Sequence, residues 1–309
     1  MTPLLLLASL LAADPAPEAV ELKTPTGTLH GSLDLPDGKG PWPVVLIHAG
    51  SGPTDRDGNG PATKSDNLKM LGQGLATQGL ACLRIDKRAI GKSRAAGLKE
   101  EDLRLTTYSD DVVLWVKWLR ADKRFGKVGF IGHSEGSLIG TLATDAKFDA
   151  FVSLCGPGRK LGVVIREQLQ KNAPKELAAK ADAILTELEA GRGVEEVPKE
   201  LVALFRPSVQ PYLISMVKPD PAKVFGELEC PALVVSGTTD IQVGEADSNA
   251  LLAARKGATG VRIKGMNHVL KEVAGTHLLL QDASYKDPKL PLHPKLLDEL
   301  AGFLGKGLK

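Results

Sequence analysis

Ser134 is the residue whose setting most clearly suggests chemistry. It lies at the centre of the pentapeptide Gly132-His133-Ser134-Glu135-Gly136, directly after an apolar run at residues 128–131. A serine on a sharp turn between a strand and a helix is held in strained backbone angles and can serve as the nucleophile of acyl transfer. Only neighbours without side chains let the strand and the helix approach so closely, which explains the two glycines. Because the pentapeptide alone is a weak signal, the prediction depends on its partners.

Asp240 and His268 are the predicted partners of Ser134. Asp240 follows an apolar run at residues 232–236, and His268 follows another at residues 261–263. The order serine, aspartate, histidine along the chain is that of hydrolases with this kind of nucleophile turn. Loops that follow parallel strands meet at one edge of the sheet, so the three side chains should converge as nucleophile, acid and base.

Other acids and imidazoles compete for these roles. Asp247 is the next candidate for the acid, and His277 is a rival base. His277 lies within a later apolar stretch, however, and we expect it to pack in a helix. His48 and His133 stand at the ends of predicted strands, where we favour structural or pocket-lining roles.

Acyl transfer also requires hydrogen-bond donors for the negative charge that develops on the substrate oxygen. The backbone N–H of Glu135, the residue after the nucleophile, is one predicted donor. The second should come from the loop Ala49-Gly50-Ser51-Gly52, which follows the apolar run at residues 43–48. Its glycines let the backbone turn its amides inward. We predict that Ser51 supplies this donor, with the amide of Gly50 as the alternative.

The segment from Asp55 to Asp66 partly matches a calcium-binding loop. Its first half reads Asp55-Arg56-Asp57-Gly58-Asn59-Gly60, and Asp66 occupies the twelfth position. An EF-hand, however, has flanking helices and usually ends in glutamate, whereas this loop follows a strand. We favour a tight polar turn whose side chains bond their own backbone. The sequence therefore predicts no metal site.

Asp86 and Arg88 follow another apolar run, at residues 81–85, and should point toward the same edge of the sheet. They could bind an anionic group of a substrate. We favour an internal role, in which the two side chains bond neighbouring loops and hold the pocket wall in place.

An alternation of strands and helices must position these residues. Continuous apolar runs are typical of strands covered on both faces, and six occur, at residues 43–48, 81–85, 128–131, 151–154, 232–236 and 261–263. Helical spacing is found between such runs and near the end of the chain, at residues 69–80, 110–119 and 292–304. Residues 19–23 and 28–35 predict an antiparallel hairpin. The predicted fold class is α/β, with a doubly wound, mostly parallel sheet.

The alternation is interrupted at residues 157–229, where helical spacing and several prolines replace the strand pattern. We predict a helical cap there, inserted into a core made of residues 18–156 and 230–309; a second small domain is the alternative. We expect the substrate pocket to be lined by residues of the cap and of the core loops: Phe205, Tyr212 and Met216, with His48, Gly50 and His133. The cap residues Val163, Leu204, Phe205, Tyr212, Leu213 and Met216 suggest an apolar or mixed acyl group.

Composition and the first residues limit the partners and the location. The chain of 309 residues has a net charge of +2, so no broad field favours nucleic acid or an anionic membrane. Residues 1–17 contain an apolar run too short to span a bilayer and predict a signal peptide and leader, with an ordinary helix as the alternative. We therefore expect a periplasmic or secreted protein without stable membrane insertion after leader removal. Three cysteines, Cys82, Cys155 and Cys230, lie in or beside apolar runs and are predicted core residues.

Together these motifs resemble those of one family. They are Ala49-Gly50-Ser51-Gly52-Pro53-Thr54-Asp55-Arg56-Asp57-Gly58-Asn59, Arg84-Ile85-Asp86-Lys87-Arg88, Gly132-His133-Ser134-Glu135-Gly136, Asp240-Ile241-Gln242-Val243 and Asn267-His268-Val269-Leu270-Lys271. The chain is similar, from about Leu35 to its final helix, to bacterial α/β-hydrolases classed with the serine aminopeptidase S33-like hydrolases and carboxylesterases. The resemblance implies an α/β-hydrolase fold, the triad Ser134, Asp240 and His268, and no cofactor. Ala89 stands where the family usually has glycine, which leaves the conformation of that turn open.

We therefore expect a serine hydrolase that cleaves small carboxylic esters through an acyl-enzyme intermediate. Amide or peptide hydrolysis on the same triad is the alternative, and an aminopeptidase would need a group such as Glu135 to hold the amino terminus of its substrate. A non-catalytic protein that binds a small molecule under the cap is a third possibility. The sequence does not indicate an oligomeric state.

Overall fold

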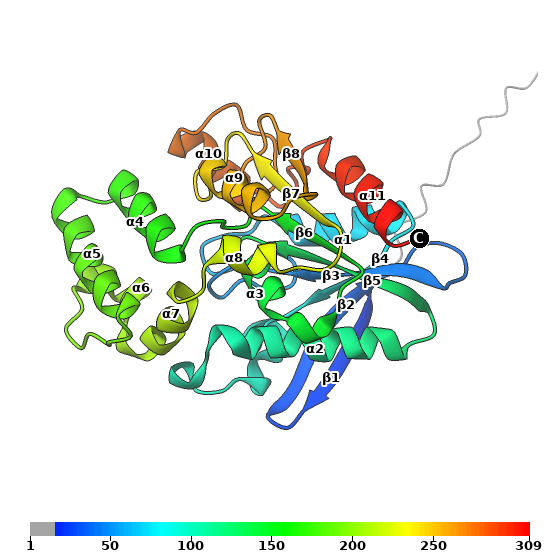
Figure 1. The fold of residues 1–309 in the computed structure, drawn as a ribbon, viewed down its shortest axis with the longest axis horizontal. Coiled ribbons are helices and arrows are strands. Elements are labelled where there is room, and N and C mark those ends of the chain that lie inside the picture. The colour runs from blue at the N-terminus through cyan, green and yellow to red at the C-terminus, as the bar shows by residue number, and fades with distance from the viewer. Residues whose placement is uncertain (1–15) are drawn as a thin grey trace, which may run out of the picture.

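The computed structural model describes residues 16–309, so the predicted leader at residues 1–17 lies almost entirely outside the described residues. One eight-stranded sheet runs through the core in the order β1-β2-β4-β3-β5-β6-β7-β8 (Figure 1). The strands are β1 (Glu18–Thr24), β2 (Gly27–Asp34), β3 (Trp42–His48), β4 (Ala81–Ile85), β5 (Phe125–His133), β6 (Ala150–Leu154), β7 (Ala232–Gly237) and β8 (Thr259–Ile263).

The order of the strands places the candidate site beside a switch point of the sheet. The hairpin β1–β2 and the pair β2–β4 are antiparallel, and every pair from β4 to β8 is parallel. The chain passes from β3 to β4 on one side and returns to β5 on the other, so β3 and β5 are neighbours that mark the switch point. His48 pairs with Gly132 at their carboxyl ends. The loop after β3 therefore leaves the sheet beside Ser134, in the place where α/β sheets bind ligands.

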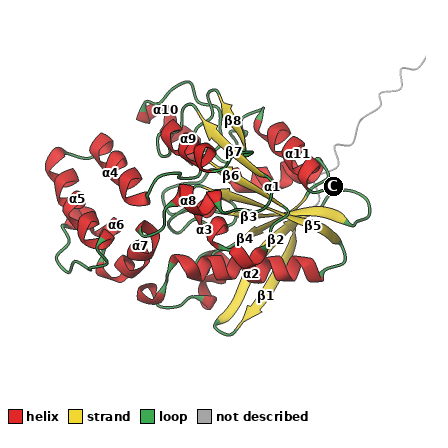
Figure 2. Ribbon diagram, viewed as in Figure 1, coloured by secondary structure: helices red, strands yellow, loops and turns green. Residues whose placement is uncertain are grey.

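Helices cover both faces of the sheet (Figure 2). One face packs against α1 (Asn67–Thr77) and α11 (Leu296–Gly307), and the other packs against α2 (Leu105–Ala121), α3 (Glu135–Leu142) and α9 (Glu245–Ala254). Alternate residues of β3 enter opposite cores, with Val44 in one and Val45 in the other. This arrangement confirms the doubly wound sheet. It also corrects the prediction for β8, which lies at the sheet edge with most of its side chains exposed or half-buried.

Helices also occupy the predicted cap segment, residues 157–229, in which the structure has no strand. They are α4 (Leu161–Asn172), α5 (Lys175–Glu189), α6 (Val202–Phe205), α7 (Gln210–Val217) and α8 (Pro221–Gly226). Figure 1 shows α4 to α7 grouped beside the sheet, whereas α8 lies over it. Phe225 of α8 packs against Phe151 of β6 with ring centroids 6.0 Å apart, so α8 contributes to the core. The remaining helix, α10 (Leu278–Lys286), lies between β8 and α11 in the chain.

Short 3-10 helices connect several of these elements. They are η1 (Gly91–Ala96), η2 (Glu100–Asp102), η3 (Thr144–Ala146), η4 (Lys199–Leu201) and η5 (Pro207–Val209). No helix within residues 16–309 is both long and apolar enough to cross a bilayer.

Replacing Ala89 with glycine is expected to stabilise the protein. Ala89 has a φ of 70°, so alanine occupies the left-handed conformation that glycine adopts freely. Relief of this strain gains roughly 1–2 kcal/mol, from which the greater freedom of glycine in the unfolded chain subtracts roughly 0.5–1 kcal/mol. Urea denaturation of Ala89→Gly should therefore give a free energy of unfolding higher by about 0.5–1 kcal/mol.

The matched control is Ala179→Gly, at an exposed position inside α5. There the same substitution is expected to lower the free energy of unfolding by about 1 kcal/mol, because helical alanine is unstrained. A loss of stability in both variants would contradict the assignment of strain to Ala89.

Candidate active site

Ser134 occupies a strained turn between β5 and α3. Its φ is 55° and its ψ is −127°, a combination that few residues with side chains adopt. A Cβ atom at Gly132 would fall 2.4 Å from the amide nitrogen of Ser137, and one at Gly136 would fall 2.5 Å from the carbonyl oxygen of His48. Both positions therefore exclude a side chain, which confirms the reason inferred for the two glycines.

Asp240 and His268 form a hydrogen-bonded pair beyond the carboxyl ends of β7 and β8, on the side of the sheet where Ser134 follows β5. His268 Nδ1 lies 2.8 Å from Asp240 Oδ2, and both side chains are buried. The other carboxylate oxygen, Oδ1, accepts hydrogen bonds from the amides of Gln242 at 2.8 Å and Val243 at 3.0 Å. Burial alone would raise the pKa of Asp240, but the His268 ring and these amides outweigh it and hold the pKa below its usual value. Asp240 is therefore an ionised acceptor that orients the imidazole.

A tight turn fixes the position of His268. The side chain of Asn267 accepts a hydrogen bond from the Lys271 amide at 3.0 Å, which closes the turn around His268. The same side chain donates to Gln281 at 3.0 Å and to Ser284 at 2.7 Å, both on α10. Helix α10 thus anchors the loop that carries the candidate base.

His133 connects this loop to the nucleophile turn. Its Nε2 donates to the backbone carbonyl of His268 over 2.8 Å, and the centroids of the two rings are 4.9 Å apart. Burial, reinforced by the neighbouring His268, lowers the pKa of His133 to about 3, so this ring stays neutral. Among the described residues, Ser134 Oγ and His268 Nε2 share no hydrogen bond; such contacts often tighten only when substrate binds.

The rival candidates have other roles. Asp247 is fully buried and forms an ion pair of 2.8 Å with Arg159, and it also accepts from the amides of Gly158 and Arg159 at 3.1 Å. It therefore ties the start of the cap segment to α9. His277 is exposed and caps α10 by accepting from the Leu279 amide at 3.4 Å. The prediction that His277 packs inside a helix is wrong, because the following leucines face solvent.

The predicted oxyanion donors belong to the two segments next to Ser134, the start of α3 and the loop after β3. Glu135 is the first residue of α3, so its N–H has no partner within the helix and adds to the positive end of the helix dipole. Gly50 lies directly against the nucleophile: a Cβ there would fall 2.9 Å from Ser134 Cβ and 3.4 Å from its Oγ. Within residues 16–309, the amides of Ser51 and Glu135 donate to no protein acceptor. Both are free to bind a substrate oxygen.

A cavity of about 260 Å³ adjoins the loop that carries Ser51. Core loops and the cap segment line it together: Gly52, Pro53, Lys87, Ala89, Ile90, Leu98, Glu100, Leu103, Tyr108, Arg206, Val209 and Tyr212. Tyr212 thus lies where a pocket residue was predicted. Phe205 and Met216 do not, because they are 0% and 5% exposed and pack in the apolar core. His48 and His133 are also buried, beneath the loops rather than in the cavity wall.

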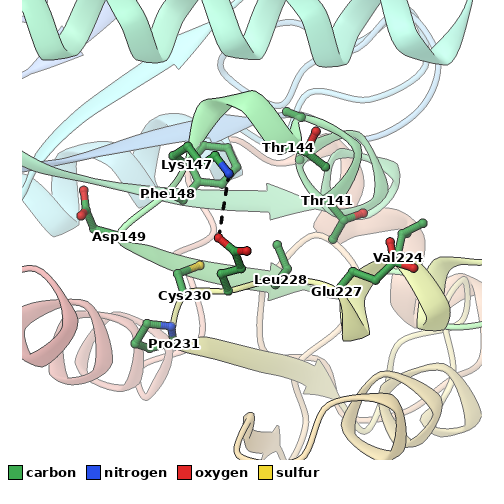
Figure 3. A pocket seen from close by; sticks show the side chains of 13 residues that line it. Thr141, Thr144, Lys147, Phe148, Asp149, Val224, Glu227, Leu228, Cys230 and Pro231 are labelled. Atoms are coloured by element: carbon green, nitrogen blue, oxygen red, sulfur yellow. Dashed lines mark ion pairs between the residues drawn. The ribbon is translucent and has the colours of Figure 1, made fainter.

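A cavity of larger volume lies away from these residues. It has a volume of about 420 Å³ and opens where β6 and β7 begin, at the amino ends of these strands, whereas Ser134 lies at the carboxyl end of β5. Figure 3 shows Lys147, Asp149, Cys230 and Glu227 around it, and an ion pair of 3.9 Å joins Lys147 to Glu229. None of the predicted site residues lines this cavity, so its size does not make it the candidate site.

Internal hydrogen bonds account for the polar loop from Asp55 to Asp66. Asp55 Oδ1 accepts from the amides of Asp57 and Asn59 at 2.9 Å, and the Asn59 side chain donates to Asp66 at 2.6 Å. Asp57 is paired with Arg84. The carboxylates are therefore used within the protein, in agreement with the tight polar turn favoured over a calcium loop.

Asp86 and Arg88 have the internal roles predicted for them. Asp86 forms an ion pair of 2.6 Å with Arg56 and also accepts from the Lys92 amide at 2.8 Å. Arg88 pairs with Asp111 and donates to the carbonyl of Ala96 at 3.0 Å. These contacts bind the loop after β4 to its neighbours.

Cys155 is a neighbour of the site that sequence reasoning missed. It follows β6, and its Sγ, the Asp240 carboxylate and a ring nitrogen of His268 all lie within 4.8 Å of one another. Burial, followed by the charge of Asp240, raises the pKa of Cys155 well above its usual value, so the thiol stays protonated. The available signal was its place at the carboxyl end of a predicted strand. Cys82 is also buried, and all three cysteines are free.

The fold and this site together define the class of protein. Residues 43–190 match the family described as the α/β-hydrolase fold, a segment that contains both the Ser51 loop and Ser134. The chain has the α/β-hydrolase fold and is a hydrolase.

Individual relatives agree with this assignment. The chain is 29% identical over 301 residues to esterase EstD from Thermotoga maritima, an alignment that covers 94% of this chain and 69% of EstD. Its structure resembles Est1E from Butyrivibrio proteoclasticus with a TM-score of 0.60 and 18% identity, over 94% of this chain and 98% of Est1E. The Pyrococcus furiosus esterase Pf2001 gives a TM-score of 0.59 and 16% identity, over 95% and 91% of the two chains. At these identities the two solved structures establish the fold alone.

Proposed function

We propose that this hydrolase cleaves carboxylic esters of small molecules through an acyl-enzyme on Ser134. The observation that carries the proposal is the 2.8 Å bond between Asp240 and His268 beside a serine held at a φ of 55°. This combination supplies an oriented base and a partly accessible nucleophile, which is what acyl transfer requires. The relative EstD, which is named an esterase, gives independent support.

In the proposed mechanism, His268 Nε2 takes the proton of Ser134 Oγ as the oxygen attacks the ester carbonyl carbon. The amides of Glu135 and Ser51 stabilise the resulting oxyanion, and Asp240 stabilises the imidazolium. The C–O bond to the alcohol then breaks, and His268 returns the proton to the leaving alcohol. Water repeats these steps on the acyl-enzyme and releases the acid.

The burial of Glu135 favours esters over substrates with a free amino terminus. Glu135 is 3% exposed, and both of its carboxylate oxygens are enclosed by protein. A substrate ammonium group cannot reach this carboxylate without rearrangement of the loops around it. The residue that an aminopeptidase role would have used is therefore inaccessible.

Two measurements on the purified protein test this proposal. A fluorophosphonate probe is expected to label Ser134, and short p-nitrophenyl esters are expected to be turned over with a kcat/KM at least about 100-fold above that of matched aminoacyl-naphthylamides. Faster turnover of the naphthylamides would assign the site to an amidase or aminopeptidase. Absence of labelling together with absence of turnover would favour a binding protein.

A further inference from the structure

Two buried side chains hold the loop that follows β3. His48 Nδ1 donates to the carbonyl oxygen of Ala49 over 2.8 Å. Lys87 Nζ donates to the carbonyl oxygens of Gly50 over 2.5 Å and Gly52 over 2.7 Å. The two side chains lie beneath the loop, with His48 1% and Lys87 3% exposed, whereas Ser51 above them faces solvent. The three carbonyls are therefore drawn toward the protein interior.

The ammonium group of Lys87 bonds these carbonyls and, within residues 16–309, forms no ion pair at contact distance. The carboxylate that acts on this charge is that of Glu135, which forms no hydrogen bond with Lys87. Burial lowers the pKa of Lys87 to about 8, and Glu135 acts in the opposite direction. Burial likewise raises the pKa of Glu135, and Lys87 and the Tyr212 hydroxyl oppose that shift. An ammonium group is costly to bury unless it is hydrogen-bonded, so the bonds to the loop carbonyls offset part of this cost.

The planar peptide bond converts these contacts into an orientation of amides. In a trans peptide the C=O and the following N–H point in opposite directions. Because Lys87 holds the Gly50 carbonyl from below, the Ser51 N–H must point away from Lys87. His48 fixes the preceding peptide in the same way and so sets the direction of the Gly50 N–H. Each buried side chain thus controls one candidate oxyanion donor beside Ser134.

We propose that Lys87 is a positioning residue that holds the Ser51 amide in the oxyanion hole. This inference rests on the proposed ester hydrolysis at Ser134. Lys87 donates to the carbonyls before and after Ser51, and these two hydrogen bonds hold the exposed Ser51 segment in one backbone conformation. Such preorganisation matters because a donor that must reorient during the reaction stabilises the oxyanion less.

The test compares Lys87→Met with the wild type on a short p-nitrophenyl ester. Methionine fills the same space but cannot donate, so kcat is expected to fall by about 10²–10³-fold, the usual effect of losing one oxyanion donor. KM should change far less, because the ground-state carbonyl carries little charge. Lys87→Arg keeps donors at this position and should recover part of the activity. The matched control is Lys92→Met, at an exposed lysine nearby, which should behave as the wild type.

A second readout separates positioning from misfolding. Fluorophosphonate titration counts the active sites, and kcat is expressed per labelled site. A trifluoromethyl ketone then serves as the probe: Ser134 Oγ adds to its carbonyl carbon and leaves an alkoxide in the oxyanion hole. Its affinity should fall in Lys87→Met by the same factor as kcat/KM.

An unchanged kcat per labelled site in Lys87→Met would overturn the role of Lys87. If His48→Phe lost the activity instead, Gly50 rather than Ser51 would be the donor. Failure of the wild type to label at Ser134 would remove the proposed function, and the inference about Lys87 with it. These three results are distinguishable in one set of purified variants.

Discussion

Ser134→Ala is expected to lower kcat for a short p-nitrophenyl ester by about 10⁶-fold, the loss typical of removing a triad serine. Alanine leaves no oxygen to attack the carbonyl carbon, so no acyl-enzyme forms. A residual acceleration of roughly 10³–10⁴ over water should remain, because the oxyanion donors and the substrate pocket are unchanged. Steady-state kinetics and fluorophosphonate labelling measure the loss, and labelling should disappear with the hydroxyl.

Ser137→Ala is the matched control for this variant. Ser137 lies on the same helix, three residues after the nucleophile, and its hydroxyl bonds Ser153 at 2.8 Å. The control should cost about 1 kcal/mol of stability for the lost hydrogen bond and leave kcat within a few-fold of the wild type. If Ser134→Ala kept most of the activity while folding normally, the nucleophile would have to be another residue.

Asp240→Asn is expected to lower kcat by about 10⁴-fold while changing the structure little. In the wild type the carboxylate accepts a hydrogen bond from His268 Nδ1, which leaves Nε2 unprotonated and able to take the proton of Ser134. An amide nitrogen at the same place would favour the opposite tautomer, with the proton on Nε2, and would not stabilise an imidazolium. The readouts are kcat for the ester and the rate of fluorophosphonate labelling, both of which depend on the base.

The control for this variant is Asp247→Asn, at the other buried aspartate that follows β7. Asp247 pairs with Arg159 and accepts from two amides, but it has no contact with His268. We expect a stability loss of about 2 kcal/mol, because a charge-assisted hydrogen bond is weakened, and an unchanged kcat. The reverse pattern, with Asp247→Asn inactive and Asp240→Asn active, would transfer the role of the acid to Asp247.

Most of the fold could be predicted because strands of a doubly wound sheet are buried on both faces. Residues 81–85 were predicted as a strand from their continuous apolar character, and β4 has these bounds. Helix α1 begins two residues before the predicted start. Its first residue is set by the preceding Asp66, which adopts a left-handed conformation with a φ of 51°. The edge position of β8 could not be predicted, because a short apolar run does not indicate how many neighbours a strand has.

The candidate site was predictable only in part. The order of Ser134, Asp240 and His268 along the chain, each after a predicted strand, indicated that they would meet, and the structure brings Asp240 and His268 into contact. The pocket was less predictable. Tyr212 lines the cavity whereas Phe205, a few residues away, is fully buried, because the direction of each side chain depends on how the helices of the cap segment pack.

The sequence by itself determined the features that depend on neighbouring residues: the strained turn at Ser134, its two glycines, the apolar strands and the loops that end on Asp240 and His268. Only the tertiary structure decided which distant side chains support them. Lys87 under the Ser51 loop, His133 against the His268 loop and Cys155 beside Asp240 are contacts between separate strands and loops. Backbone strain and hydrophobic periodicity are local and can be read along the chain, whereas such contacts arise only when the sheet aligns the ends of its strands.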